Sequence, residues 1–264
     1  MFAIVKGTIH EAIAKKIILG FFALSTLIIF IFLVLVNIES IDSVVEVSKQ
    51  TDIKAAVIGF ESIIMGVSYL FIITISLIAV SSIIPSMVEK GNIDLLLSKP
   101  IGRTKIIIGK FVGGVILIFL NLVYLIGCVW LILSLKSGFW HFPFLYSIIW
   151  LTVSFAVIYS LVILLGLTTQ STIISSIVTL FLVLIVLPIL GARADIADVL
   201  KNDFVKFVLD FFYYILPKPG GINMISAAQI TEQPIESWLP LWTSLLFMVT
   251  MLALSIYYFK KKDY

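Results

Sequence analysis

The stretch "VEKGNIDLLLSKPIGRTKIIIGK", residues 88–110, lies between two long apolar runs of the sequence. It carries five basic and two acidic side chains, and three consecutive leucines precede Ser-Lys-Pro. Asn92 can cap a short helix, Asp94 suits the positive end of its dipole, and Pro100 ends it. Exposed leucines in water need an apolar partner. The stretch therefore predicts a short helix outside the apolar runs that docks on another protein. The alternative is that its leucines dip into the inner lipid leaflet.

The composition of the chain is that of a membrane protein. It has 264 residues, of which 61% are hydrophobic and 12% charged, and a soluble domain of this size needs more surface charge. The apolar residues form runs of about 20, the length of a helix that spans about 30 Å of hydrocarbon. They do not form the alternating segments of about ten residues that are typical of an outer-membrane barrel. We therefore predict an all-α integral membrane protein.

Six apolar runs predict six transmembrane helices. We expect them at residues 17–36, 57–84, 106–135, 144–167, 173–190 and 239–259. The first run follows two lysines, but it is too long for a signal peptide and no small-x-small cleavage site follows it. Helical spacing of apolar residues at 1–16 predicts an additional interfacial, or elbow, helix.

The segment between the fifth and sixth runs, residues 191–238, is expected on the outer side. Within residues 193–215, apolar and charged residues recur at helical spacing on opposite faces, which predicts a second amphipathic helix. The sequence "LPKPGG" at 216–221 then breaks that helix. We expect an outer helical hairpin or a re-entrant segment here.

The distribution of charge predicts the orientation. With the N-terminus in the cytoplasm, the inner segments hold eleven Lys and Arg against four Asp and Glu. The outer segments hold seven basic against ten acidic residues. Because basic residues concentrate in cytoplasmic segments, both termini are expected in the cytoplasm.

The charged stretch resembles the membrane subunit of ABC-2 type ABC transporters. That family typically shows an acidic residue, Gly-Thr-Leu, Leu-Leu-Ser-x-Pro, a basic residue and a Gly-Lys pair. The matching residues here are Glu89, Gly91, Asp94, Leu96, Leu97, Ser98, Pro100, Arg103, Gly109 and Lys110. Asn92 stands where Thr is commoner, and Ile93 where Leu is commoner. The order of predicted elements also agrees over the whole chain. In its single-chain size and its lack of a fused ATPase, the chain is most similar to NosY-type permeases and their exporter relatives. NosY-type permeases serve copper-site maturation of nitrous oxide reductase.

The resemblance implies that residues 88–104 form a coupling segment. Its residues would contact a separate ATPase subunit: Glu89, Gly91, Asp94, Leu95, Leu96, Leu97, Pro100 and Arg103. That subunit would bind ATP and Mg, whereas this chain is expected to hold no metal or cofactor. The chain lacks a Walker A loop, because Gly109-Lys110 is followed by Phe111 rather than Ser or Thr.

The expected partners follow from the same resemblance. They are the ABC ATPase subunit, a second permease subunit that most simply makes a homodimer, and the lipid bilayer. A periplasmic accessory protein is a further candidate, whereas nucleic acid is not expected. The expected location is the inner or plasma membrane of a prokaryote. The expected function is ATP-driven export of a hydrophobic or amphipathic molecule, or transmission of motion to a periplasmic partner.

Three further features are singled out by residue type. Gly109 and Gly113 form a G-x-x-x-G motif, which predicts close helix packing, either static or at a moving contact. Glu61 either lines an outer vestibule or stands in water on the first turns of a long helix. His141 is expected alone, and Lys110 is expected to extend to the lipid headgroups.

Two other function classes remain open. An ATPase-independent channel or carrier usually has charged or unwound motifs at mid-membrane, which the runs lack apart from Pro188 and scattered Ser and Thr. An intramembrane enzyme needs paired catalytic groups. The sequence has neither H-E-x-x-H nor G-x-S-x-G, and only one carboxylate, Glu61, within the apolar runs.

Overall fold

The computed structural model describes residues 2–14, 16–37, 50–81, 102–193, 196, 199 and 203–262, and these residues form helices and their connections without a strand. The elements are α1 (Phe2–Ala14), α2 (Ile17–Asn37), α4 (Gln50–Ser81), α7 (Arg103–Ser137), η1 (Phe142–Leu145), α8 (Tyr146–Thr169), α9 (Thr172–Phe181), the π-helical η2 (Leu182–Val186), α10 (Leu187–Gly191), α12 (Asp203–Ile215), α13 (Pro219–Ile230) and α14 (Leu239–Lys261). The all-α class is thus confirmed for this part of the chain.

Four described segments are long and apolar enough to cross a membrane. They are α7, η1 with α8, the continuous α9–η2–α10 segment, and α14. The bent pair α1 and α2 makes a fifth candidate if it is counted as one broken span. The expected number of six spans stays a prediction. α4 begins at Gln50, before the apolar run at Val57, because the polar residues that precede the run continue its helix.

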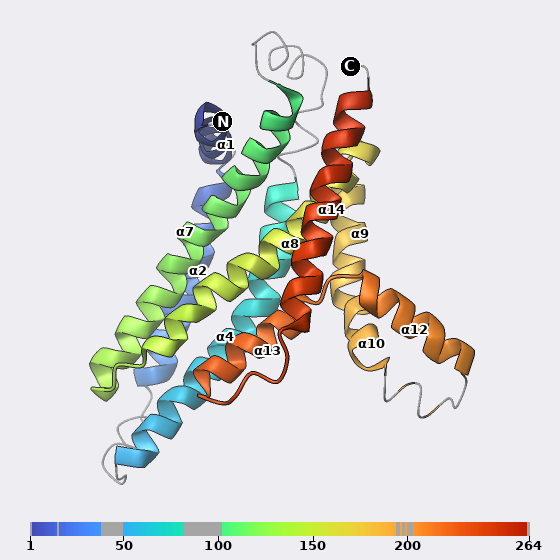
Figure 1. Ribbon diagram of the computed structural model, residues 1–264. Helices are drawn as coiled ribbons and strands as arrows, with labels where there is room; N and C mark the ends of the chain where they lie inside the picture. The colour runs from blue at the N-terminus through green and yellow to red at the C-terminus, as the bar shows by residue number, and fades with distance from the viewer. Residues whose placement is uncertain are drawn as a thin grey trace.

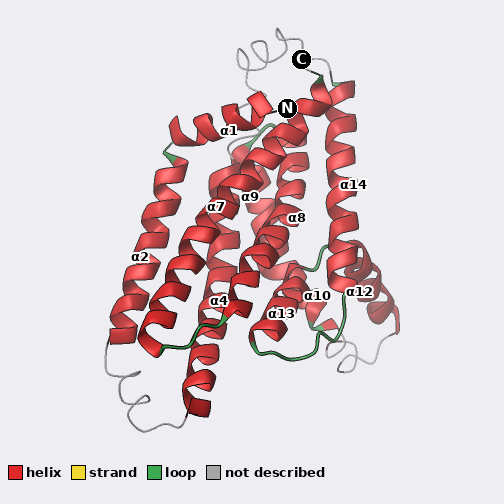
Figure 2. Ribbon diagram, turned by 60° about the vertical axis from the view of Figure 1, so that its left-hand side comes forward, coloured by secondary structure: helices red, strands yellow, loops and turns green. Residues whose placement is uncertain are grey.

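Both termini lie at the same end of the bundle, which we call the terminal end (Figure 1). The predicted orientation would place this end in the cytoplasm. The opposite end, where α7 turns into α8 and where α12 and α13 lie, is called the far end. Figure 2 shows α1 lying across the terminal end, steeply inclined to α2, and the bend between the two helices is 68°.

The position of α1 is fixed by glycines on α7. A Cβ built at Gly109 would lie 2.8 Å from Cγ2 of Ile4, and one built at Gly113 would lie 2.8 Å from Cβ of Thr8. Only a residue without a side chain admits α1 this closely. The G-x-x-x-G motif therefore packs against the first helix of the same chain.

The centre of the bundle is α8, which contacts α7, α14, α13, α4 and α9. Its Phe155, Tyr159 and Val162 are fully buried. The Tyr159 ring stacks with Phe111 and with Phe155, with centroid distances of 5.9 and 5.4 Å. A helix that is apolar all round is expected in such an interior position.

The segment from Thr172 to Gly191 remains continuous through Pro188. Proline lacks the backbone N–H that would bond to the carbonyl four residues earlier, so a regular α-helix cannot continue unchanged through it. The turn before it, Leu182–Val186, is widened to a π-helix, which accommodates the proline without ending the helix.

Candidate functional site

The predicted coupling segment is described only at its end. Glu89, Gly91, Asp94, Leu95, Leu96, Leu97 and Pro100 lie outside the described residues, and Arg103 is the first residue of α7. Its Nη1 donates hydrogen bonds to the carbonyl oxygens of Phe259 at 3.1 Å, Lys260 at 3.1 Å and Lys262 at 2.9 Å. The last carbonyls of a helix have no partner within it, and a cation there also suits the helix dipole. Arg103 therefore ties the start of α7 to the end of α14.

Lys110 makes a second link at the terminal end. Its Nζ forms a short ion pair with Glu11 of α1, and the lysine side chain is 8% exposed. The expectation that Lys110 extends to the headgroups is wrong in this structure, because α1 lies over it and supplies a carboxylate. α1 is thus held on α7 by an ion pair as well as by glycine packing.

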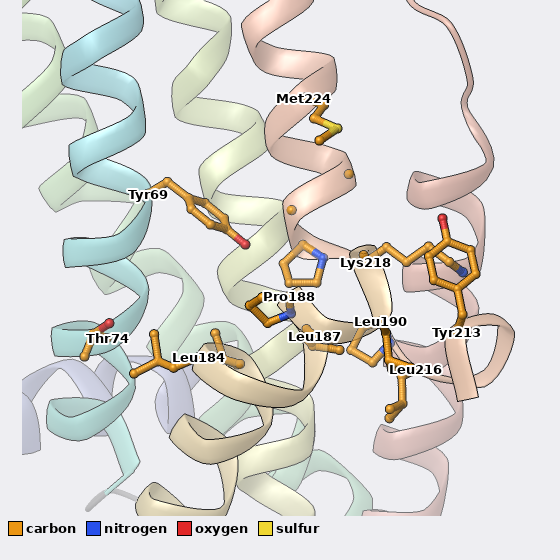
Figure 3. A pocket seen from close by; sticks show the side chains of 16 residues that line it. Tyr69, Thr74, Leu184, Leu187, Pro188, Leu190, Tyr213, Leu216, Lys218 and Met224 are labelled. Carbon is orange, nitrogen blue, oxygen red and sulfur yellow. The ribbon is translucent and has the colours of Figure 1, made fainter. Parts of the chain in front are cut away.

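A pocket of about 470 Å³ lies among α4, η2, α10, the end of α12 and the start of α13 (Figure 3). Most of its lining is apolar, including Val183, Leu187 and Leu190. Residues 216–221, the segment "LPKPGG", all line it, and we call this segment the pocket mouth. A Cβ at Gly221 would lie 2.6 Å from Pro240, so this glycine lets α13 begin directly against α14.

The lysine of that segment is buried beside the pocket. Lys218 is 7% exposed, and its Nζ donates to Oγ1 of Thr243 at 3.0 Å. Its backbone N–H donates to Oγ of Ser244 at 2.9 Å. The ammonium also lies 4.4 Å from the centre of the Tyr213 ring. Burial, and secondarily the charge of Arg193, lowers the pKa of Lys218.

A polar cluster joins three elements towards the far end. Oε2 of Glu61 lies 2.5 Å from Nδ1 of His141, and both side chains are at most 3% exposed. The other ring nitrogen lies 3.6 Å from Oε1 of Glu232, whose Oε2 accepts from Lys54 at 2.7 Å. Burial lowers the pKa of His141, and the hydrogen bond from Lys54 lowers the pKa of Glu232.

The comparison with protein families decides the class of this molecule. Residues 2–264 match the family model described as ABC-2 family transporter protein. The chain belongs to the ABC-2 transporter family. The comparison with curated proteins gives no match. Members of the ABC-2 family are generally non-catalytic membrane subunits that work with an ABC ATPase subunit.

Within this ABC-2 protein, the Glu61 cluster fits a structural brace. His141 was expected alone and Glu61 in water or at a vestibule, but the structure buries the two together. They are far apart in the sequence, and the bend between α7 and α8 brings His141 to α4. No set of three His, Cys, Asp or Glu residues that could hold a metal occurs among the described residues. The pair therefore fixes α4 against the α7–α8 bend.

A double-mutant cycle measures this brace. We expect Glu61→Leu and His141→Leu each to lower the free energy of unfolding by about 2 kcal/mol, because each leaves the other group buried without its partner. We expect the double variant to lose less free energy of unfolding than the sum of the two single losses. Unfolding by titration with SDS in mixed micelles measures all three.

The exposed pair of Lys54 and Glu232 provides the control. Both side chains are more than 40% exposed, so Lys54→Met should cost at most about 1 kcal/mol. Strictly additive losses at Glu61 and His141 would show that the two groups do not depend on each other.

Proposed function

We propose that this chain is the permease subunit of an ATP-driven ABC-2 transporter and exports an amphipathic molecule. The observation that carries the proposal is the family match over residues 2–264. A separate ATPase subunit binds ATP and Mg and contacts the coupling segment 88–104 in the cytoplasm. Two permease chains, as a homodimer, pair with two ATPase subunits in the inner or plasma membrane.

The contacts of α14 support a mechanical route between the two ends. At its C-terminal end, α14 is held by Arg103, three residues after Pro100 of the coupling segment. At its N-terminal end, Thr243 and Ser244 bond to Lys218 at the pocket mouth. The helix has 23 residues and is therefore about 35 Å long. A displacement of the coupling segment would move α14 as a rigid body and change the pocket mouth.

Figures 1 and 2 help to locate this route, because in both views α14 runs from the terminal end down to the level of α12 and α13.

The pocket supports export of an amphipathic molecule, since its volume lies in the range of about 300–1,000 Å³ that is usual for small-molecule sites. Its walls include residues of α12 and α13, and both helices contact α14, so the pocket is linked to the α14 route.

A NosY-like role is the second candidate, favoured by the surface of α12. This helix exposes Phe204, Phe207 and Phe211 by 74%, 68% and 52%. An aromatic face at the far end suits lipid at the membrane surface, and it equally suits a periplasmic accessory protein. In that role, ATP-driven motion would be passed to the accessory protein.

Co-expression with an ABC ATPase subunit from the same organism tests the proposal. We expect the two proteins to co-purify, and we expect the permease to change the rate of ATP hydrolysis by the ATPase. Transport by the purified chain without any ATPase would instead favour a channel or carrier. Hydrolysis of a substrate by the chain alone would favour an intramembrane enzyme.

A further inference from the structure

The pocket beside α13 has the makeup of a site for one amphipathic molecule. None of the described residues that line it is acidic, and its walls are mostly aliphatic. Figure 3 shows the Tyr69 side chain directed from α4 into the space in front of Pro188. Tyr69 is half-buried, and among the described residues nothing bonds to its hydroxyl. The pocket thus offers apolar walls together with a hydrogen-bond donor.

The charges near the mouth are unbalanced. Within the described residues, Lys218 has no carboxylate at ion-pair distance, although it is 7% exposed. Arg193 lies over the Tyr213 ring, which the Lys218 ammonium also faces, and its guanidinium carbon is 3.3 Å from the ring centre. The carboxylate of Asp210 pairs with Arg193, at 2.9 Å from its Nε. Among the described residues, Arg193 therefore has a carboxylate partner, whereas the buried Lys218 has none.

A buried ammonium without a counter-ion is unfavourable, and an anionic ligand would supply one. Thr243 gives it a neutral hydrogen bond and Tyr213 gives it an aromatic face, but neither carries a negative charge. A charge-assisted hydrogen bond from Lys218 to an anion would be about twice as strong as a neutral one. An anionic group is therefore the ligand that would best stabilise the charged form of Lys218.

We propose that the pocket binds a single-chain amphiphile with an anionic head group, whose hydrocarbon chain lies between α4 and the η2–α10 segment and whose head group contacts Lys218. The inference rests on the proposed function, because it names the class of molecule that the permease handles. The anionic head is a carboxylate or a phosphate, which both accept bonds from lysine. A neutral amphiphile would fit the walls and leave the ammonium unpaired.

Binding of three probes with the same oleoyl chain tests the proposal. The full chain, purified in an uncharged detergent, is titrated with oleate, oleoyl lysophosphatidate and neutral monoolein. We expect the two anions to bind at least about tenfold more tightly than monoolein, as a charge-assisted hydrogen bond implies. The comparison of oleate with lysophosphatidate distinguishes a fatty-acid site from a phospholipid site.

Variants separate the head-group contact from the apolar walls. We expect Lys218→Met to bring both anions to about the affinity of monoolein while monoolein still binds, which shows that the variant is folded. Lys218→Arg should keep the preference for anions. Leu187→Trp, which fills the pocket, should weaken all three probes. Lys206→Met is the matched control, since Lys206 is an exposed lysine of α12, and it should change nothing.

Two outcomes would overturn the proposal: a preference for anions that survives Lys218→Met, or binding of all probes that survives Leu187→Trp. The result is independent of ATPase recruitment. If the ATPase does not bind but the Lys218-dependent preference is found, the permease assignment fails and the pocket assignment stands. If the ATPase binds and the preference is absent, only the pocket assignment fails.

Discussion

Replacing Leu96 and Leu97 together with aspartate is expected to abolish recruitment of the ATPase subunit. Under the proposed function, these leucines would contact an apolar groove of the partner. Two carboxylates in that groove would be buried without counter-charges, and each such charge costs several kcal/mol or more. We expect the ATPase to be absent from the purified complex, and its activity to be unaffected by the permease.

The matched control keeps the apolar character of the segment. Leu96→Met and Leu97→Met together preserve volume and hydrophobicity, so the complex should form as in the unsubstituted protein. Cysteine labelling at position 96 provides an independent measurement, since a thiol there should react from the cytoplasmic side and be protected by the ATPase. Unchanged recruitment by the aspartate variant would mean that the leucines do not contact the ATPase.

The second large effect is expected at Gly114, where α7 meets α8. A Cβ at this position would lie 2.6 Å from Cε1 of Tyr159. That ring is fully buried and stacks with Phe111 and with Phe155, so its neighbours restrict how far it can move. Gly114→Leu should therefore lower the free energy of unfolding by about 3 kcal/mol or more, as severe overpacking does. SDS titration in mixed micelles measures the loss.

Gly127 on the same helix is the control. A Cβ there has no atom within 4 Å, so Gly127→Leu adds the same side chain to α7 without a collision. The free energy of unfolding of this variant should stay within about 1 kcal/mol of that of the unsubstituted protein, since leucine is also a better helix former than glycine. Equal losses at positions 114 and 127 would contradict the packing described for α7 and α8.

The helices that cross the bundle could be predicted from the sequence because lipid imposes a length on them. The run at 106–135 corresponds to α7 at Arg103–Ser137, and the run at 239–259 corresponds to α14 at Leu239–Lys261. Apolar length is a local property, so it can be measured along the chain. The limits differ by a few residues because a helix continues past the apolar run wherever its backbone bonds can.

The contacts that build the candidate site could not be predicted in the same way. Lys110 and Glu11 are joined only because α1 folds back across α7. Glu61 and His141 meet only where α4 passes the bend between α7 and α8. Lys218 stood within "LPKPGG", a sequence that indicated only a break in the chain. Each pairing depends on how helices cross, which hydrophobic periodicity does not specify. The predicted coupling residues other than Arg103 lie outside the described part of the chain.

The two anchored ends of α14 set a limit on its length. Arg103 holds the carbonyls at one end, and Thr243 and Ser244 hold Lys218 at the other. Each residue of an α-helix turns the chain by about 100°, so one inserted residue between the anchors would rotate one set of contacts away from its partner. Seven inserted residues would restore the angular phase but separate the anchors by about 10 Å more. Evolution can therefore change the side chains of α14 far more freely than it can add or remove residues within it.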